Sequence, residues 1–278
     1  MNVKRYVALL MAVILLAISL AGCSGQKEVE IKDDTAGKTK LKVATNAEFA
    51  PWESIENGKY VGADIEIIEA IAEKLGMEVE IQNMEFEAVL SALVSKTCDV
   101  AISGLTITQA REKQVDFSDP YYKAAQVLIV RSDDTVFTGT TKEELDNQLK
   151  NKKIGVCTGF TGQQYVEGDP DWPFEPIEGS EAIIYDNIAL AVQGLKSKAI
   201  DVIVMDGPTA ADAASADDNK DAIRIIDVPL TVERYAIGVQ KGNTELMGKI
   251  NKALKELQEE GKIAEILAKY DMEVPGDL

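Results

Sequence analysis

A segment of twelve residues occurs twice in the chain, 102 residues apart. ALVSKTCDVAIS at residues 92–103 aligns without a gap with GLKSKAIDVIVM at residues 194–205, so that Leu, Ser, Lys, Asp and Val recur in register. Each copy has the pattern of a helix end, a tight turn and a buried strand. In open α/β sheets a ligand binds beyond the carboxyl ends of the strands. We therefore expect two lobes whose residues from 103 and from 206 face each other across a cleft.

The rest of the chain from residue 41 alternates short β-branched runs with helical patterns, which favours parallel sheets flanked by helices. The helix at 64–75 has the clearest period and ends at Gly76. The other predicted helices are 87–96, 186–198, one near Pro208, 243–260 and 262–270. The predicted strands are 41–45, 79–82, 99–103, 154–157, 201–205, 223–227 and 235–240.

The last strand and two helices are too few for a third domain, so we expect them to pack on the first lobe. The chain then crosses between the lobes twice, and two crossings form a hinge. The predicted fold is an α/β clamshell. Its parts are lobe 1 at 41–120 plus 236–278, lobe 2 at 126–229, and hinge segments at 121–125 and 230–235.

The N-terminus has the order of a secretion signal. Residues 1–22 contain two basic residues, an apolar run at 7–20 and small residues before Cys23. The run is shorter than the roughly 20 residues that a helix needs to cross a bilayer. LAGC, ending at Cys23, resembles a lipobox, in which the cysteine is acylated with chains such as palmitate; the alternative is an ordinary signal with a chance cysteine. Residues 23–40 are predicted to be the lipidated cysteine and a flexible tether, so we expect a membrane-anchored protein on the extracytoplasmic face.

Charge and composition exclude several classes of function. The chain has 47 acidic and 29 basic residues, a formal net charge of −18 and no histidine. Nucleic acid is a poor partner for such a surface, and Ser-His-Asp catalysis, Cys-His catalysis and most zinc sites need histidine. We expect a monomer with no catalytic residue, cofactor or metal. Cys98 and Cys157 lie in strand-like runs and are predicted to be buried thiols, while the sequence also allows a disulfide between them.

The residues with the most informative chemistry follow the first repeated strand. Ser103, Gly104 and Thr106 lie in a predicted turn, and Arg111 follows them. A turn there exposes backbone N–H groups and a hydroxyl, and a guanidinium offers a planar fork that matches a carboxylate. Arg111 could equally be a solvated charge on a helix, and spacing alone does not decide between these readings.

Six motifs in order resemble the type 3 extracellular solute-binding proteins, the polar amino acid receptors of ABC importers. The resemblance covers residues 41–271. The motifs are FAPWE at 49–53, GADIE at 62–66, DVAISGLTITQAR at 99–111, FSDPYY at 117–122, TGFTGQQY at 158–165 and DVIVMD at 201–206. The resemblance implies a two-lobed fold of the type II periplasmic-binding-protein kind. It also implies that a free polar L-amino acid binds between the lobes and that an ABC transporter permease is the partner.

The resemblance further implies which residues hold a ligand carboxylate. Arg111 would clamp the α-carboxylate, helped by Thr106 and by backbone and hydroxyl groups of Thr161. This chain has Phe160 where the family commonly has a small residue, which puts the role of Thr161 in question.

The α-ammonium would be held by Asp206, by the carbonyl of Ser103 or Gly104, and by the Thr106 hydroxyl. A zwitterion taken from water needs both charges paired and hydrogen-bonded. One set of residues is therefore expected to hold both the α-carboxylate and the α-ammonium of the ligand.

The resemblance also implies the walls around a ligand side chain. Phe49 and Phe86 would form them, with core packing as the alternative for both, and Trp52 is expected to pack in the core. Asn46 stands where several relatives that prefer basic ligands, and also glutamine receptors, carry an aspartate. A neutral Asn46 weakly disfavours arginine and lysine, although Glu48 could substitute for the aspartate.

Two other functions stay open beside amino acid binding. One is an amino-acid-sensing module that acts through a separate signalling partner. The other is an enzyme like the cyclohexadienyl dehydratases, with Glu48 as the acid. The missing histidine and the zwitterion-binding residues favour binding without catalysis.

Overall fold

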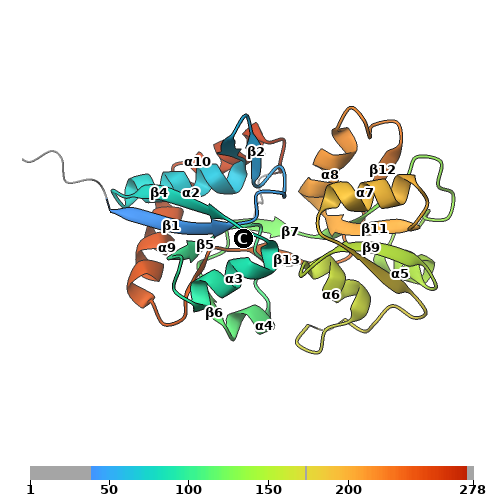
Figure 1. Ribbon diagram of the computed structural model, residues 1–278, viewed down its shortest axis with the longest axis horizontal. Helices are drawn as coiled ribbons and strands as arrows, with labels where there is room; N and C mark the ends of the chain where they lie inside the picture. Colours follow the sequence, from blue (N-terminus) through green and yellow to red (C-terminus); the bar gives the residue numbers. More distant parts are fainter. Residues whose placement is uncertain (1–38, 173, 274–278) are drawn as a thin grey trace, which may run out of the picture. The chain divides into compact units, whose positions relative to one another are not determined.

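The computed structural model describes residues 39–172 and 174–273 and contains two five-stranded sheets (Figure 1). The predicted signal peptide, Cys23 and the tether as far as residue 38 lie outside the described residues. The strand that starts the first sheet begins at Lys40, the last residue of the predicted tether. None of the helices in the described ranges has the length and apolarity that a bilayer crossing requires.

The first sheet has the strand order β4-β1-β5-β14-β6. Its strands come from both ends of the described chain: β1 (Lys40–Thr45), β4 (Glu78–Asn83), β5 (Val100–Ala101), β6 (Val115–Phe117) and β14 (Gly238–Gln240). A separate hairpin joins β2 (Ser54–Glu56) and β3 (Lys59–Val61). The helices in these parts of the chain are α2 (Ala63–Lys74), α3 (Phe86–Val94), α4 (Gln109–Glu112), α9 (Thr244–Glu259) and α10 (Lys262–Lys269).

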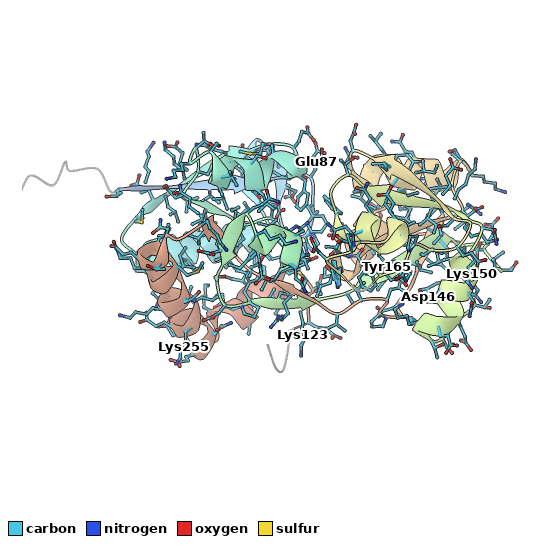
Figure 2. All side chains as sticks on the ribbon, turned by 90° about the horizontal axis from the view of Figure 1, so that it is seen from below. Glu87, Lys123, Asp146, Lys150, Tyr165 and Lys255 are labelled. Atoms are coloured by element: carbon cyan, nitrogen blue, oxygen red, sulfur yellow. The ribbon has the colours of Figure 1, made fainter. Side chains whose placement is uncertain are left out.

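The second sheet has the strand order β10-β9-β11-β8-β12. Its strands come from one continuous stretch: β8 (Gln126–Arg131), β9 (Lys153–Cys157), β10 (Glu181–Tyr185), β11 (Val202–Asp206) and β12 (Ile223–Ile226). The helices in this stretch are α5 (Lys142–Leu149), α6 (Thr161–Glu167), α7 (Ile188–Lys196) and α8 (Gly207–Ser215). Tyr165 of α6 donates a hydrogen bond to Asp146 of α5, which joins the two helices (Figure 2).

The predicted parallel sheets are in fact mixed, because each contains one strand that runs antiparallel to its neighbours. In the first sheet β14 runs antiparallel to β5 and β6, and in the second sheet β8 runs antiparallel to β11 and β12. Both strands follow short segments that pair with each other, β7 (Tyr122–Ala124) and β13 (Glu233–Tyr235). A strand that enters a sheet at the end where the other strands finish must run antiparallel to those strands. The predicted strand at 235–240 is divided, since Tyr235 ends β13 and Gly238–Gln240 form β14.

The internal repeat is reproduced in backbone detail. Lys96 and Lys198, the paired residues after α3 and α7, have left-handed φ angles of 61° and 64°. Asp99 and Asp201 each accept a hydrogen bond from a backbone N–H of their sheet's neighbouring strand, Lys42 and Lys153, at 2.9 Å. The repeated Asp therefore fixes where each strand begins, and the residues beyond the strands occupy equivalent positions.

The C-terminal elements complete the first sheet and its helical layer. β14 lies between β5 and β6, and α9 and α10 pack against α2 through their apolar faces. Figure 1 shows these late elements in red and orange beside the blue and cyan ones. Cys98 and Cys157 are buried and unpaired, which confirms the prediction of two thiols.

Candidate functional site

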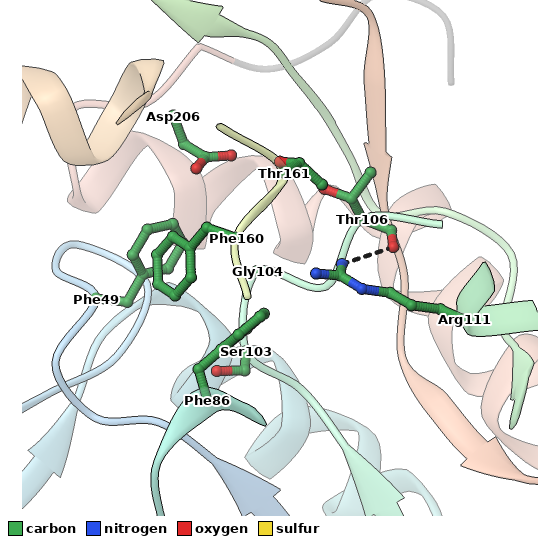
Figure 3. Close-up of a pocket in the computed structure, with 9 residues that line it drawn as sticks. All are labelled: Phe49, Phe86, Ser103, Gly104, Thr106, Arg111, Phe160, Thr161 and Asp206. Atoms are coloured by element: carbon green, nitrogen blue, oxygen red, sulfur yellow. Dashed lines mark hydrogen bonds between the residues drawn. The ribbon is translucent and has the colours of Figure 1, made fainter. Parts of the chain in front are cut away.

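A small pocket lies at the residues that follow the repeated strands (Figure 3). Its volume is about 10 Å³, close to the least space that one water molecule needs. Side chains of the lining residues therefore fill most of it. The lining consists of Phe49, Phe86, Ser103, Gly104, Thr106, Arg111, Phe160, Thr161 and Asp206.

The loop after β5 supplies three of the predicted site residues, and its shape depends on Gly104. Gly104 has a left-handed φ of 52°, and a Cβ atom there would lie 2.5 Å from Cε1 of Phe49. Its N–H donates to the buried Asp64 carboxylate at 2.7 Å. Glycine therefore lets the Phe49 ring close against the loop.

Arg111 is buried and contacts the segments of both sheets. It lies in α4, where Thr108 caps the helix by accepting a hydrogen bond from the Arg111 N–H. Nη1 donates to the Thr106 carbonyl at 2.9 Å, and Nη2 donates to the Gly159 carbonyl at 3.2 Å. Burial lowers the pKa of Arg111, and the carboxylates of Glu233 and Asp206 oppose that change. The reading of Arg111 as a solvated helix charge is wrong.

Asp206 is the last residue of β11 and is also buried. Its carboxyl group accepts a hydrogen bond from the Tyr235 hydroxyl. Burial, followed by the negative charge of Glu233, raises the pKa of Asp206 to about 7. The pocket thus contains a guanidinium and a carboxyl group, both withdrawn from water.

Thr106 and Thr161 are joined by a residue that was not predicted. Both hydroxyls donate to the same oxygen of Glu233, at 2.6 Å from Thr106 and 2.9 Å from Thr161. Thr161 begins helix α6, so the second half of the predicted turn TGFTGQQY is helical. The hydroxyl of Thr161 is consequently not free to donate elsewhere.

Three phenylalanines form the apolar side of the pocket. The Phe160 ring lies 5.1 Å from Phe49 and 4.5 Å from Phe86 between ring centroids. The Arg111 guanidinium carbon lies 5.3 Å from the centroid of Phe86, within the range of a cation–π contact. Phe160, the residue that departs from the family pattern, therefore belongs to the pocket.

Asn46 is a predicted site residue that does not line the pocket. Its side-chain amide donates to the Met84 carbonyl at 3.0 Å. The Ser103 hydroxyl also points into the protein, where it donates to Glu53 at 2.6 Å. The prediction for Ser103 or Gly104 concerned only a backbone carbonyl, so the hydrogen bond of the Ser103 hydroxyl does not bear on it.

Phe160 is the one lining residue that was not predicted as part of the site, and three further unpredicted residues lie beside the pocket. Glu233 and Tyr235 belong to β13, and Gln126 starts β8. Trp52 is buried among Tyr121, Tyr122 and Tyr235 as the packing prediction required. The alternation of Thr231, Glu233 and Tyr235 toward one face could have located Glu233, but hydropathy alone would have buried Val232, which is 82% exposed.

A comparison with protein families identifies the chain. The model of the bacterial extracellular solute-binding proteins, family 3, matches residues 41–273. The chain belongs to this family. The match covers every residue around the pocket of this family 3 protein, and the resemblance of the six motifs is confirmed.

Two relatives and one solved structure agree with this family 3 assignment. The arginine-binding extracellular protein ArtP of Bacillus subtilis is 31% identical over 96% of the chain and 98% of its own length. A probable histidine-binding protein of Neisseria gonorrhoeae is 30% identical over 97% and 96%. The structure of an ancestral arginine-binding protein bound to arginine is 39% identical, has a TM-score of 0.73 and covers 84% of this chain and 98% of its own. The predicted two-lobed α/β fold of the type II kind is confirmed.

Proposed function

We propose that this family 3 protein is the extracytoplasmic receptor of an ABC importer and binds a free polar L-amino acid. The observation that carries the proposal is that Arg111 and Asp206, two buried groups of opposite charge, line one pocket at the ends of the repeated strands. An amino acid zwitterion can leave water only where both of its charges find partners. A guanidinium fork matches the α-carboxylate and a carboxylate matches the α-ammonium.

The three aromatic rings indicate which ligand side chains to test first. The π faces of Phe49, Phe86 and Phe160 can stack on apolar groups and can also attract a cation. The relatives described above include proteins named for arginine and for histidine. L-arginine and L-histidine are therefore the first probes for the site.

The small volume of the pocket supports a mechanism in which binding and closure are coupled. The proposed ligand first contacts Arg111, Thr106 and Phe49, and then Thr161 and Asp206 close onto it. Binding favours closure only through the additional contacts that Thr161 and Asp206 make with the ligand. In this proposal lobe 1 is 41–120 plus 236–278, lobe 2 is 126–229, and the paired strands β7 and β13 lie in the hinge segments.

The proposed location rests on the N-terminal sequence and the family. Members of the family are extracellular proteins by description. Cys23 would carry the lipid anchor, and residues 24–40 would tether the folded part to the outer face of the membrane. Mass spectrometry of the purified protein tests this, because an acylated Cys23 adds the mass of its fatty acyl groups.

The decisive experiment is isothermal titration of the full chain, purified in mild detergent, with the twenty L-amino acids and prephenate. We expect one or a few amino acids to bind with a single site. Arg111→Ala should weaken binding by roughly thirty-fold to several thousand-fold, the usual effect of removing one partner of a buried charge pair. Arg234→Ala is the matched control, because Arg234 is exposed and lies outside the pocket.

Each outcome separates the functions considered. Binding of an amino acid that is lost in Arg111→Ala and kept in Arg234→Ala supports the receptor. Turnover of prephenate would replace it with the dehydratase. Amino acid binding without uptake by cells that lack a competing importer would point to the sensing module. If no amino acid binds, the proposed function is wrong.

A further inference from the structure

Glu233 is a buried carboxylate that does not line the pocket itself. It contacts Thr106 in the loop after β5 and Thr161 in α6, two residues that do. It lies on β13 and is 2% exposed. One of its oxygens accepts from Gln126 Nε2 at 3.1 Å and from the Thr231 hydroxyl at 2.7 Å. The other accepts from the hydroxyls of Thr106 and Thr161. Four donors on two oxygens satisfy a carboxylate, which only accepts hydrogen bonds.

This arrangement fixes the direction of two hydroxyl protons. A threonine hydroxyl has one proton and two lone pairs. Because the protons of Thr106 and Thr161 point at Glu233, both hydroxyls can offer only lone pairs to other groups. The Thr161 oxygen already accepts from Gln126 Nε2 at 3.1 Å. Thr106, which lies next to Thr161 in Figure 3, therefore faces the pocket as an acceptor.

An acceptor at Thr106 suits an ammonium and cannot donate to a carboxylate. The Thr106 carbonyl receives one arm of the Arg111 guanidinium, so the two polar ends of the pocket meet at this residue. The Thr106 hydroxyl and the Asp206 carboxylate are then the acceptors for the ligand's ammonium, and the Arg111 guanidinium is the charged donor for its carboxylate.

We infer that Glu233 is a positioning residue that gives the pocket its polarity, because it orients the Thr106 hydroxyl to accept a hydrogen bond from the ligand's α-ammonium. The inference rests on the proposed function, since it concerns how that site distinguishes an amino acid from an acid without the amino group. Glu233 itself does not touch the ligand.

The test compares L-arginine with 5-guanidinopentanoate, which lacks only the α-ammonium, and L-histidine with 3-(imidazol-4-yl)propionate. Dissociation constants are measured by titration for the full-length parent and for Glu233→Gln. The substitution keeps the shape but replaces one acceptor oxygen with an NH₂ donor. Gln126 Nε2 donates to the first oxygen of Glu233, so the introduced NH₂ faces Thr106 and Thr161 and forces their protons to turn away.

We expect the parent to prefer the amino acid over its des-amino analogue by at least tenfold. In Glu233→Gln this preference should fall by about ten-fold or more, the effect of losing a hydrogen bond to a charged group, because only the amino acid binds more weakly. Thr231→Val is the control. It removes another donor to Glu233 but no group that lines the pocket, and its preference should equal that of the parent.

A second variant covers the case in which Glu233→Gln does not fold. Thr106→Val removes the hydroxyl at nearly constant volume and should lower the preference by a similar factor, while Thr106→Ser should keep it. Equal weakening of an amino acid and its analogue in these variants would overturn the inference, because it would mean that Glu233 and Thr106 act only through the fold. A parent that binds none of the twenty L-amino acids would refute the proposed function, and the inference with it.

Discussion

The Phe160 ring stands edge-on to the Phe49 ring, with centroids 5.1 Å apart and planes at 89°. Phe160 precedes helix α6 and Phe49 lies in the loop between β1 and β2, so the contact joins segments of the two sheets. With Phe86 on its other side at 4.5 Å, the ring of Phe160 occupies space that the pocket would otherwise have.

We predict that Phe160→Ser changes selectivity by ligand size. Removal of the ring enlarges the pocket, so a long side chain gains room while a small one leaves a cavity. The ratio of the dissociation constant of L-alanine to that of L-arginine should rise by about tenfold. Titration of both ligands measures it, with Phe174→Ser as the control because Phe174 packs on Tyr165 and Trp172 outside the pocket. An unchanged ratio would mean that Phe160 does not limit ligand size.

Amino acid binding should release a proton below neutral pH. Burial raises the pKa of Asp206 to about 7, so the free protein holds a proton there at pH 6, whereas pairing with an α-ammonium requires the carboxylate. Affinity should fall by up to about tenfold for each pH unit below 7. Titrations at pH 6 in two buffers of different ionisation enthalpy should give close to one proton released. Asp206→Asn should release none, and a dissociation constant that is flat from pH 5 to 7.5 would contradict the assignment.

Gly104→Ala should destabilise the fold and weaken binding together. The φ of 52° disfavours any side chain, and the added Cβ would meet the buried Phe49 ring at 2.5 Å. We expect a loss of about 2–4 kcal/mol in the free energy of unfolding, measured by urea denaturation. Gly76→Ala separates the two causes, since Gly76 has a φ of 67° and nothing within 4 Å of an added Cβ. That control should lose only about 1–2 kcal/mol, the cost of the left-handed conformation alone.

Asp64 should make stability depend on pH. Burial raises the pKa of Asp64 from 3.8 to about 7, despite hydrogen bonds from the Gly104 N–H and the Tyr121 hydroxyl. The folded protein therefore binds a proton that the unfolded chain releases between these values. This contribution to stability is complete below about pH 4 and is lost as the pH rises through 7. From pH 4 to 7 the free energy of unfolding of Asp64→Asn, relative to that of the parent, should rise by up to about 1.4 kcal/mol per pH unit. Above pH 7 this difference should stay constant. A constant difference in unfolding free energy over this range would refute the proton on Asp64.

The sequence predicted the helices and the buried strands well, because their signals are local. The apolar period of 64–75 depends only on neighbours in the chain. Asp99 and Asp201 each depend on one contact with a backbone N–H. The directions of β8 and β14 depend instead on where the chain enters each sheet, and residues near those strands do not encode this. Short strands such as β2, β3 and β6 have too few residues to show a period.

The pocket residues other than Phe160 followed from motifs, and the groups that support them did not. Phe49, Arg111 and Asp206 lie beside positions that the repeat or the family resemblance marks. Glu233 has no such mark, because its burial depends on hydrogen bonds from residues up to 127 positions away. The role predicted for Asn46 stays a prediction, since its side-chain amide donates to Met84 and the residue does not line the pocket.

The place of β14 between β5 and β6 has a consequence for the order in which the molecule can be assembled. All strands of the second sheet lie between residues 126 and 226, so a chain exported N-terminus first presents all of them before Gly238. The first sheet starts earlier but is split until β14 emerges, because β6 has no other partner in it. Although its strands are made first, the N-terminal sheet must therefore finish last, and premature termination before Gly238 would leave β5 and β6 as open edges.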